Sequence, residues 1–387
     1  MQKKINIGLV GYKFMGKAHS NAFRKVGMFF DLPVELGMRA ICGREESWVK
    51  ESARKMGWDG YELDWKTLVK REDIDVIDIT APSNTHKEIA MAAAENGKHI
   101  FCEKPLALTV GDAREMLATV EKYKVKHQVG FNYRFAPAIL LAKKMIDEGK
   151  IGQVYHFRGQ YLQDYIIDPS FPRVWRLDKS VAGSGSHGDL SAHVIDLARF
   201  LVGEPTKVSG ISKTFIKERP LVLSMQGLSA TVDANAPMAP VTVDDATIFL
   251  TEFDNGALGV FEATRFAAGY KNAMFFEING SKGTIRYQLE RFNELEYFSR
   301  EDEEGYQGFR TIGVTEPVHP YLEHWWPPGH IIGYEHTFVH EMHSFLDAVI
   351  NDKKTAPDFN DGVKCAQVLD AVDLSIEENS WINVADV

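Results

Sequence analysis

The stretch that decides the fold is INIGLVGYKFMGKAHS, residues 5–20. An apolar run rich in β-branched residues (5–10) leads into Gly11 and Gly16, and a helical segment (16–28) follows. Glycines in this position, between a strand and a helix, are typical of the dinucleotide-binding turn G-x-G-x-x-G. Gly11 would make the tight turn and Gly16 would let the helix approach the strand. The first helical amides would then face a phosphate.

Lys13 departs from this motif, because it stands where the middle glycine is expected. That glycine lets the backbone come close to a pyrophosphate, and a side chain takes up space there. The lysine also brings a positive charge within reach of cofactor phosphates. We therefore predict an altered phosphate site that includes Phe14 and Met15; a structural turn that binds no nucleotide is the alternative.

The segments that follow the turn alternate between strands and helices. Strands are predicted at 5–10, 38–42, 76–80, 99–105 and 126–132. Strands that alternate with helices indicate βαβ units and a parallel sheet. We therefore predict an α/β protein whose Rossmann domain, binding NAD(P), spans residues 1–135.

Residues 136–387 show a different pattern, in which helices flank a series of closely spaced strands. The predicted helices are 138–149, 187–202, 334–351 and 361–377, and the predicted strands are 152–162, 206–213, 244–252, 257–265, 273–279, 283–288 and 294–299. Turn pairs between some of these strands favour antiparallel hairpins. We predict an α+β domain with one large, mostly antiparallel sheet, and a surface loop or flap at 220–243.

The end of the second strand, AICGREES (40–47), bears on the choice of cofactor. An enzyme that uses NAD normally has Asp or Glu there to accept the ribose 2′-hydroxyl. Gly43 and Arg44 stand in that place, and a guanidinium suits a 2′-phosphate. The pair favours NADP, although Glu45 could still reach a 2′-hydroxyl.

Polar residues follow the third and fourth strands, at the edge where open α/β sheets bind ligands. TAPSNTH (80–86) and CEKP (102–105) are the two segments. Lys104 would lie near a nicotinamide and hold a substrate hydroxyl; a solvated lysine paired with Glu103 is the alternative. From these segments we assign to the cofactor site Thr80, Pro82, Asn84, His86, Glu103 and Lys104.

A third segment, GSGSHGDLSAHVIDLARFL (183–201), carries Asp189 and His193 four residues apart, on one face of a predicted helix. Imidazole is a natural acceptor for a hydroxyl proton near neutral pH, and a carboxylate can orient it. A helix-capping Asp followed by a core His is the alternative.

Residues near these motifs complete the predicted sites. Those for the cofactor are Asn132, Trp175 and Arg176. Those for the substrate are Tyr133, Arg134, Gln163, Asp164, Trp175, Arg176 and His187, together with Lys104, Asp189 and His193.

The chain resembles the glucose-fructose oxidoreductase/inositol dehydrogenase/MocA (Gfo/Idh/MocA) family over nearly its whole length. The resemblance rests on four motifs in this order: the turn at 11–16, PSNTH (82–86), EKP (103–105) and GDLSAH (188–193). The resemblance implies a Rossmann domain followed by an open-faced sheet, through which homodimers or homotetramers form. It also implies that Lys104, Asp189 and His193 are catalytic.

The activity implied by the resemblance is NAD(P)-dependent hydride transfer from a secondary hydroxyl of a sugar, anhydrosugar, glycoside or inositol. Two alternatives remain open. One is a glycoside-cleaving enzyme of the same fold that keeps its cofactor, and the other is a non-catalytic sugar or nucleotide sensor.

Composition narrows the remaining choices. The chain has 387 residues, and its formal net charge of −10 argues against sequence-independent nucleic-acid binding. No apolar stretch approaches the about 20 residues of a membrane helix, and the apolar run near the first residue is too short for a signal peptide, so we expect a cytoplasmic protein. The three cysteines are predicted to be buried free thiols. No metal is expected: the histidines at 336, 340 and 343 share a helix face, which we assign to packing on the sheet.

Overall fold

The computed structural model describes residues 3–222, 224–226, 229–231 and 236–387. The chain forms two compact units: unit 1 is Met1–Asn132 with Glu335–Ala366, and unit 2 is Tyr133–Tyr334 with Gln367–Val387. The first boundary lies close to the predicted domain end at residue 135. Residues 335–366, which we assigned to the second domain, belong instead to the same compact unit as the N-terminal residues.

Unit 1 is built on a six-stranded parallel sheet with the order β3-β2-β1-β4-β5-β6. Its strands are β1 (Lys3–Val10), β2 (Val34–Cys42), β3 (Gly60–Glu62), β4 (Val76–Ile79), β5 (His99–Glu103) and β6 (His127–Gly130). The order reverses between β1 and β4, which is the switch point where such sheets bind ligands. This confirms the predicted Rossmann-type architecture, although the short strand β3 was not predicted.

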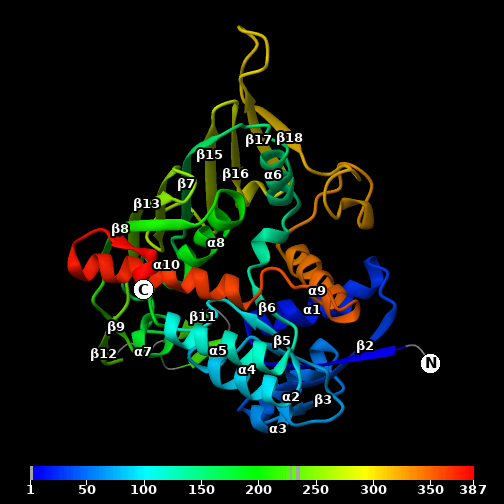
Figure 1. Ribbon diagram of the computed structural model, residues 1–387. Helices are drawn as coiled ribbons and strands as arrows, with labels where there is room; N and C mark the ends of the chain where they lie inside the picture. The colour runs from blue at the N-terminus through cyan, green and yellow to red at the C-terminus, as the bar shows by residue number, and fades with distance from the viewer. Residues whose placement is uncertain (1–2, 223, 227–228, 232–235) are drawn as a thin grey trace. The chain divides into compact units, whose positions relative to one another are not determined.

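The helices of unit 1 connect successive strands, and one comes from late in the chain. They are α1 (Phe14–Phe29), α2 (Glu46–Met56), α3 (Trp65–Val69), α4 (His86–Glu95), α5 (Val110–Tyr123) and α9 (Tyr334–Ile350). Figure 1 shows α9, in orange, beside the blue α1. Phe338 of α9 lies 5.5 Å from the ring of His19, and Phe345 lies 5.5 Å from Phe101. These aromatic contacts explain why 335–366 belong to unit 1.

Unit 2 is built on a nine-stranded sheet with the order β18-β17-β16-β15-β7-β14-β13-β8-β19. Its strands are β7 (Val154–Leu162), β8 (Pro205–Lys213), β13 (Ala246–Phe253), β14 (Leu258–Thr264), β15 (Ala273–Gly280), β16 (Gly283–Gln288), β17 (Glu294–Ser299), β18 (Arg310–Gly313) and β19 (Ile382–Asn383). All neighbours pair antiparallel except β7 and β14. The large, mostly antiparallel sheet is therefore confirmed.

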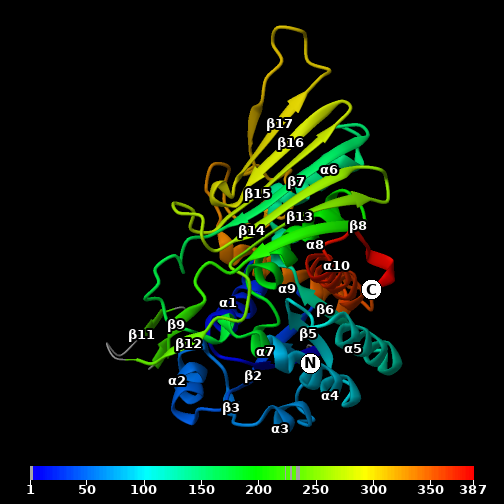
Figure 2. The ribbon, with the colours of Figure 1, turned by 90° about the vertical axis from the view of Figure 1, so that its left-hand side faces the viewer.

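Helices cover one face of this sheet and leave the other open (Figure 2). The helices of unit 2 are α6 (Pro137–Asp147), α7 (Lys179–Ala182), a π-helical turn at His187–Ser191, α8 (Ala192–Leu201) and the later residues of α10 (Phe359–Glu378). Along β13 the side chains alternate: Phe249 is 1% exposed, whereas Ile248 and Leu250 are exposed. This period of two separates the covered face from the open one.

The segment predicted as a loop or flap, 220–243, contains short strands in its described part. β9 (Glu218–Pro220) pairs with β12 (Met238–Pro240), and β10 (Ser224–Gln226) pairs with β11 (Ser229–Thr231). The segment predicted as a surface loop or flap thus contains two antiparallel pairs of short strands among its described residues. Residues 223, 227–228 and 232–235 lie outside the described residues. Within the ranges given above, no helix is long and apolar enough to cross a membrane.

Gly16→Ala is expected to lower the free energy of unfolding by about 2 kcal/mol or more, because an added Cβ would lie 2.2 Å from the carbonyl oxygen of Gly11. Gly27→Ala, on the same helix, is the matched control, since no atom lies within 4 Å of its added Cβ. It should raise stability by about 0.5–1 kcal/mol. Urea denaturation measures both, and an undiminished stability of the Gly16 variant would contradict the packing described.

Candidate active site

The turn between β1 and α1 is closely packed. Gly11 has φ of 111°, in the region that favours glycine, and an added Cβ would lie 2.6 Å from Thr80 Oγ1. The Thr80 hydroxyl donates to the carbonyl of Val10 over 3.0 Å, which ties the end of β4 to the turn. Lys13 stands just before α1 and is exposed. The lysine therefore leaves the contact between Gly11 and Gly16 undisturbed.

Gly43, at the end of β2, packs against the ring of Tyr12. A Cβ at this position would lie 2.1 Å from a ring carbon of Tyr12, so no larger residue fits while the tyrosine stays in place. Burial and the charge of Glu45 raise the pKa of Tyr12, while Arg44 lowers it in part. Tyr12 thus takes the space that an acidic side chain at residue 43 would need. Arg44 and Glu45 are exposed beside it.

The loop after β4 divides into exposed and buried positions. Pro82 and Asn84 are exposed, whereas His86 is 1% exposed. His86 Nε2 lies 2.9 Å from the carbonyl oxygen of Ala81, and Nδ1 lies 3.0 Å from that of Pro105. Burial lowers the pKa of His86. The imidazole therefore links the loops after β4 and β5, a structural position that differs from the cofactor contact predicted for it.

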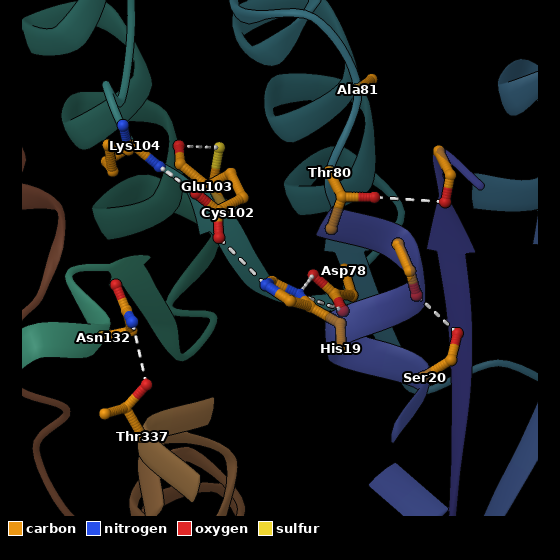
Figure 3. Close-up of polar contacts among 12 residues, drawn as sticks. His19, Ser20, Asp78, Thr80, Ala81, Cys102, Glu103, Lys104, Asn132 and Thr337 are labelled. Atoms are coloured by element: carbon orange, nitrogen blue, oxygen red, sulfur yellow. Dashed lines mark hydrogen bonds and ion pairs between the residues drawn. The ribbon is translucent and has the colours of Figure 1, made fainter. Parts of the chain in front are cut away.

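A second buried histidine joins the ends of β4 and β5 (Figure 3). His19 Nδ1 lies 2.9 Å from Asp78 Oδ2, and Nε2 lies 2.9 Å from Glu103 Oε1. The other oxygen of Glu103 accepts from the backbone N–H of Lys104 over 3.1 Å. Burial by itself would lower the pKa of His19, but the charges of Asp78 and Glu103 and their hydrogen bonds raise it to about 10. The imidazole is therefore an imidazolium at neutral pH.

Asn132, also assigned to the cofactor site, follows β6. Its amide nitrogen donates to Thr337 Oγ1 of α9 over 2.8 Å, as Figure 3 shows, and the residue is 3% exposed. This bond anchors the chain at the edge of the sheet where Lys104 also lies.

In unit 2, Asp189 lies in the π-helical turn that precedes α8. Its Oδ2 accepts from Nη2 of Arg265 over 2.6 Å. Arg265 is 1% exposed, whereas one third of the Asp189 side chain is exposed. Burial would lower the pKa of Arg265, but Tyr165 and Asp189 raise it, so the guanidinium keeps its charge. A buried cation thus supports a carboxylate that reaches solvent.

Asp244 anchors the start of the same helical segment. Its carboxylate accepts from the backbone N–H of Gly185 over 2.7 Å and of His187 over 2.8 Å, and from the hydroxyls of Ser186 and Thr247. Burial would raise the pKa of Asp244, but the charge of His187 and these hydrogen bonds lower it. A side-chain anion at the start of a helix satisfies amides that have no partner within the helix.

His193 lies in the first turn of α8, against a cluster of aromatic and amide side chains. Its ring centre is 4.6 Å from that of Tyr133 and 6.0 Å from that of Tyr161. The two tyrosine hydroxyls are 2.8 Å apart, and the hydroxyl of Tyr161 donates to Asn272 Oδ1. Gln163 donates to the same oxygen over 2.9 Å. The structure thus groups three residues predicted for substrate binding: Tyr133, Gln163 and His193.

Two other residues predicted to bind substrate are held in the interior of unit 2. Arg134 donates two hydrogen bonds to Asp196, and this ion pair is buried. His187 is 1% exposed, and its Nε2 lies 3.1 Å from the carbonyl oxygen of Leu369. These contacts favour a structural role for both residues over the sugar contacts we predicted.

The last predicted residues lie nearer the surface. The guanidinium of Arg176 stacks over the ring of Trp175, 4.5 Å from its centre. Asp164 pairs with Lys271 over 2.7 Å and accepts from the N–H of Gly269, which lowers the pKa of Asp164. Their predicted contacts with cofactor and substrate remain predictions.

The histidines of α9 pack against an aromatic ring. His343 stacks on Phe30 with ring centres 4.2 Å apart, and His340 meets the same ring edge-on at 6.0 Å. The histidine face thus packs on Phe30, which directly follows α1, while Phe345 of the same helix packs on Phe101 of the parallel sheet in unit 1. Among the described residues, no three His, Cys, Asp or Glu side chains are grouped as metal ligands.

Several residues of the site were missed by sequence analysis. Asp78 offered a signal, because an acid within the apolar run VIDIT needs a buried partner. Arg265, which directly follows the apolar strand β14, offered a similar one. The missed residues are His19, Asp78, Tyr161, Asp244, Arg265 and Asn272.

A parallel sheet whose first helix begins at a closely packed glycine turn defines a dinucleotide-binding protein, and the buried charges behind Lys104 and Asp189 are typical of an enzyme. Comparison with known families agrees. Residues 5–131 match the oxidoreductase family with an NAD-binding Rossmann fold, and residues 139–286 match the GFO/IDH/MocA C-terminal domain. The chain belongs to the Gfo/Idh/MocA family of oxidoreductases and has its NAD-binding fold.

Within this family, the chain is similar to levoglucosan dehydrogenase. That enzyme from Pseudarthrobacter phenanthrenivorans is 43% identical over 391 residues, which cover 100% of this chain and 99% of the enzyme. A solved structure of levoglucosan dehydrogenase with NADH and levoglucosan has a TM-score of 0.93 and 42% identity, and covers 100% of both chains. Inositol 2-dehydrogenase of Rhizobium meliloti is 26% identical, covering 98% of this chain and 99% of its own.

His19→Gln is expected to lower stability in a pH-dependent way. The pKa of the folded imidazole, about 10, exceeds its ordinary value of 6.5, so its stabilisation is complete below about pH 6.5 and is lost as the pH rises towards 10. The difference in unfolding free energy between wild type and variant should therefore shrink between pH 7 and pH 10. Urea denaturation at a series of pH values measures it; a constant difference would contradict the charged state.

Proposed function

We propose that this chain is an NAD(P)-dependent dehydrogenase that moves a hydride between a secondary hydroxyl of a sugar, anhydrosugar, glycoside or inositol and the nicotinamide. The proposal rests on family membership and on the full-length similarity to levoglucosan dehydrogenase. The observation that carries it is the support of Asp189, a half-buried carboxylate held by the buried Arg265 one turn before His193. A buried charged group that holds a solvent-accessible charged side chain in place is typical of a catalytic site.

In the proposed mechanism, His193 accepts the proton of the substrate hydroxyl, and the nicotinamide, when bound, accepts the hydride. The ammonium of Lys104 stabilises the negative charge that develops on the substrate oxygen. Asp189 positions either His193 or a neighbouring substrate hydroxyl, and Arg265 holds the carboxylate through a hydrogen bond of 2.6 Å. Tyr133 packs against His193 and limits its rotation.

We further propose that the cofactor site accepts NADP. Tyr12 fills the space beside Gly43, so the acid that would accept a ribose 2′-hydroxyl has no room at this position. Arg44 follows and is exposed, which suits a guanidinium that pairs with a 2′-phosphate. The solved levoglucosan dehydrogenase binds NADH, so NAD is the competing cofactor to measure.

The open face of the unit 2 sheet is proposed to join chains into a homodimer or homotetramer. The exposed apolar side chains Ile248 and Leu250 lie on β13 and Val260 lies on β14. Ile248 and Val260 line a hollow of about 460 Å³ together with Arg158 and Glu277. A contiguous apolar patch rimmed by charge is typical of a protein interface. Analytical ultracentrifugation that finds only monomer would contradict it.

We also propose a cytoplasmic enzyme that needs neither nucleic acid nor membrane. The formal net charge of −10 supports this, because non-specific nucleic-acid binding needs an excess of lysine and arginine. Cell fractionation that places the chain with membranes or nucleic acid would contradict the proposal.

Lys104→Met and His193→Ala are each expected to lower kcat/KM by at least about 100-fold, because each removes a charge or proton acceptor needed at the transition state. Initial rates of nicotinamide reduction with levoglucosan measure the loss, and circular dichroism checks that both variants fold. Activity near wild type in either variant would refute the assigned role.

Monosaccharides, anhydrosugars, glycosides and inositols, each tested with NAD and NADP, define the substrate class. We expect one reduced nicotinamide per oxidised sugar. A product without net reduction of the cofactor would instead indicate a glycoside-cleaving enzyme that regenerates it.

Arg44→Ala is expected to weaken NADPH binding by about 10-fold or more and NADH binding by far less, because only NADPH carries the 2′-phosphate. Lys50→Ala, an exposed lysine on α2, is the control for a general loss of positive charge. Fluorescence titration measures both cofactors; equal weakening would refute the role of Arg44.

A further inference from the structure

Three buried groups connect the first helix to the main chain of the proposed catalytic lysine (Figure 3). The side chains of His19 and Asp78 are 0% exposed and that of Glu103 is 6% exposed. They come from α1, β4 and β5, and each ring nitrogen of His19 lies 2.9 Å from a carboxylate oxygen. The cluster lies at the edge of the sheet where ligands bind in this fold.

The hydrogen-bond pattern determines the charge of the cluster. A neutral imidazole has one N–H and one lone pair, so it could donate to Asp78 or to Glu103 but not to both. Two short contacts to ionised carboxylates are satisfied only by an imidazolium that donates on both sides, and the raised pKa of His19 agrees with this form. His19 therefore offsets one of the two buried negative charges, and its removal would take this donor away from Asp78 and from Oε1 of Glu103.

Glu103 connects His19 to the main chain of Lys104. Its Oε1 accepts from His19, while its Oε2 accepts from the backbone N–H of Lys104 over 3.1 Å. The carboxylate also lies against the main chain of β6, since a Cβ on Gly130 would be 2.9 Å from Oε1. One orientation of Glu103 thus satisfies the imidazolium, the lysine amide and the packing against Gly130.

We propose that His19 is a positioning residue: its imidazolium, held by Asp78, fixes the carboxylate of Glu103, which orients the main chain from which the Lys104 ammonium projects. The inference rests on the proposed catalytic role of Lys104. If the cluster served stability alone, apolar side chains of similar volume would stabilise the fold at least as well, because burying charges is costly. The three buried charged groups lie directly behind Lys104. The need to place this lysine accurately explains why they are present.

The test compares His19→Gln with Val26→Ala, which truncates a buried apolar side chain of the same helix and lowers stability without touching the cluster. His19→Gln should lower kcat by about 10- to 100-fold, as misplacement of a catalytic group does. The dissociation constant for NADH should change by less than about 3-fold, because the proposed effect of His19 acts on the Lys104 ammonium in the chemical step and not on the phosphate-binding turn. Val26→Ala should keep the wild-type kcat; an equal loss in both variants would overturn the proposal.

A double-mutant cycle with Glu103→Gln tests the path of the effect. Because His19 acts through Glu103, the double variant should be no slower than the slower single variant. Losses that multiply would show two independent effects and overturn the proposal. If His19→Gln does not fold, Asp78→Asn is the second variant: it keeps the imidazole in place but removes the charge that holds it, and its kcat should fall in the same direction.

A readout independent of activity separates this proposal from the proposed function. Lysines are methylated with a carbon-13 label, and the Lys104 resonance is identified by its absence in Lys104→Arg. The resonance should move in His19→Gln and stay in place in Val26→Ala; an unmoved resonance would overturn the positioning role. If wild type oxidises no sugar, the proposed function fails, and this measurement still decides whether His19 positions Lys104.

Discussion

The contact between the α-carbon of Gly16 and the carbonyl of Gly11 sets the position of everything at the ligand edge of unit 1. No Cβ fits in this contact, since it would lie 2.2 Å from the carbonyl oxygen. Because α1 begins this close to β1, its second turn brings His19 against the ends of β4 and β5. Asp78 pairs with Leu9 in the parallel register, so the imidazole meets its carboxylate directly behind the turn. The close approach of the two glycines thus fixes the position of the buried ion pair between His19 and Asp78.

The two units support their proposed functional side chains in the same physical way. In unit 1 a buried imidazolium lies behind Lys104, and in unit 2 a buried guanidinium lies behind Asp189. A side chain that reaches solvent loses conformational entropy when it is ordered, and a buried charged group that fixes its carboxylate or its main chain supplies part of that order before the ligand arrives. Asp244 adds to this in unit 2, because it holds the start of the helical segment that carries Asp189 and His193.

Sequence analysis succeeded where the pattern was local. Most strands of both sheets lie within a few residues of their predicted positions, because each is an apolar run with clear turn residues at its ends; β18 and β19 were not predicted. β3 and α3 were missed, since three and five residues respectively are too few to show a period. The assignment of 335–366 followed chain order, whereas the aromatic contacts of α9 with α1 and β5 decide its unit.

The sequence by itself determined the fold class, the family and the residues offered to the cofactor and substrate, because turn glycines, strand ends and motif order are local properties of the chain. Only the tertiary structure decided which polar residues are available. Arg134 and His187 share a segment with predicted site residues but find buried partners in Asp196 and Leu369, while His19 and Arg265, each far along the chain from the group it supports, lie beside it. The reason is that a buried charge is stable only next to its partner, and folding chooses that partner by distance in space.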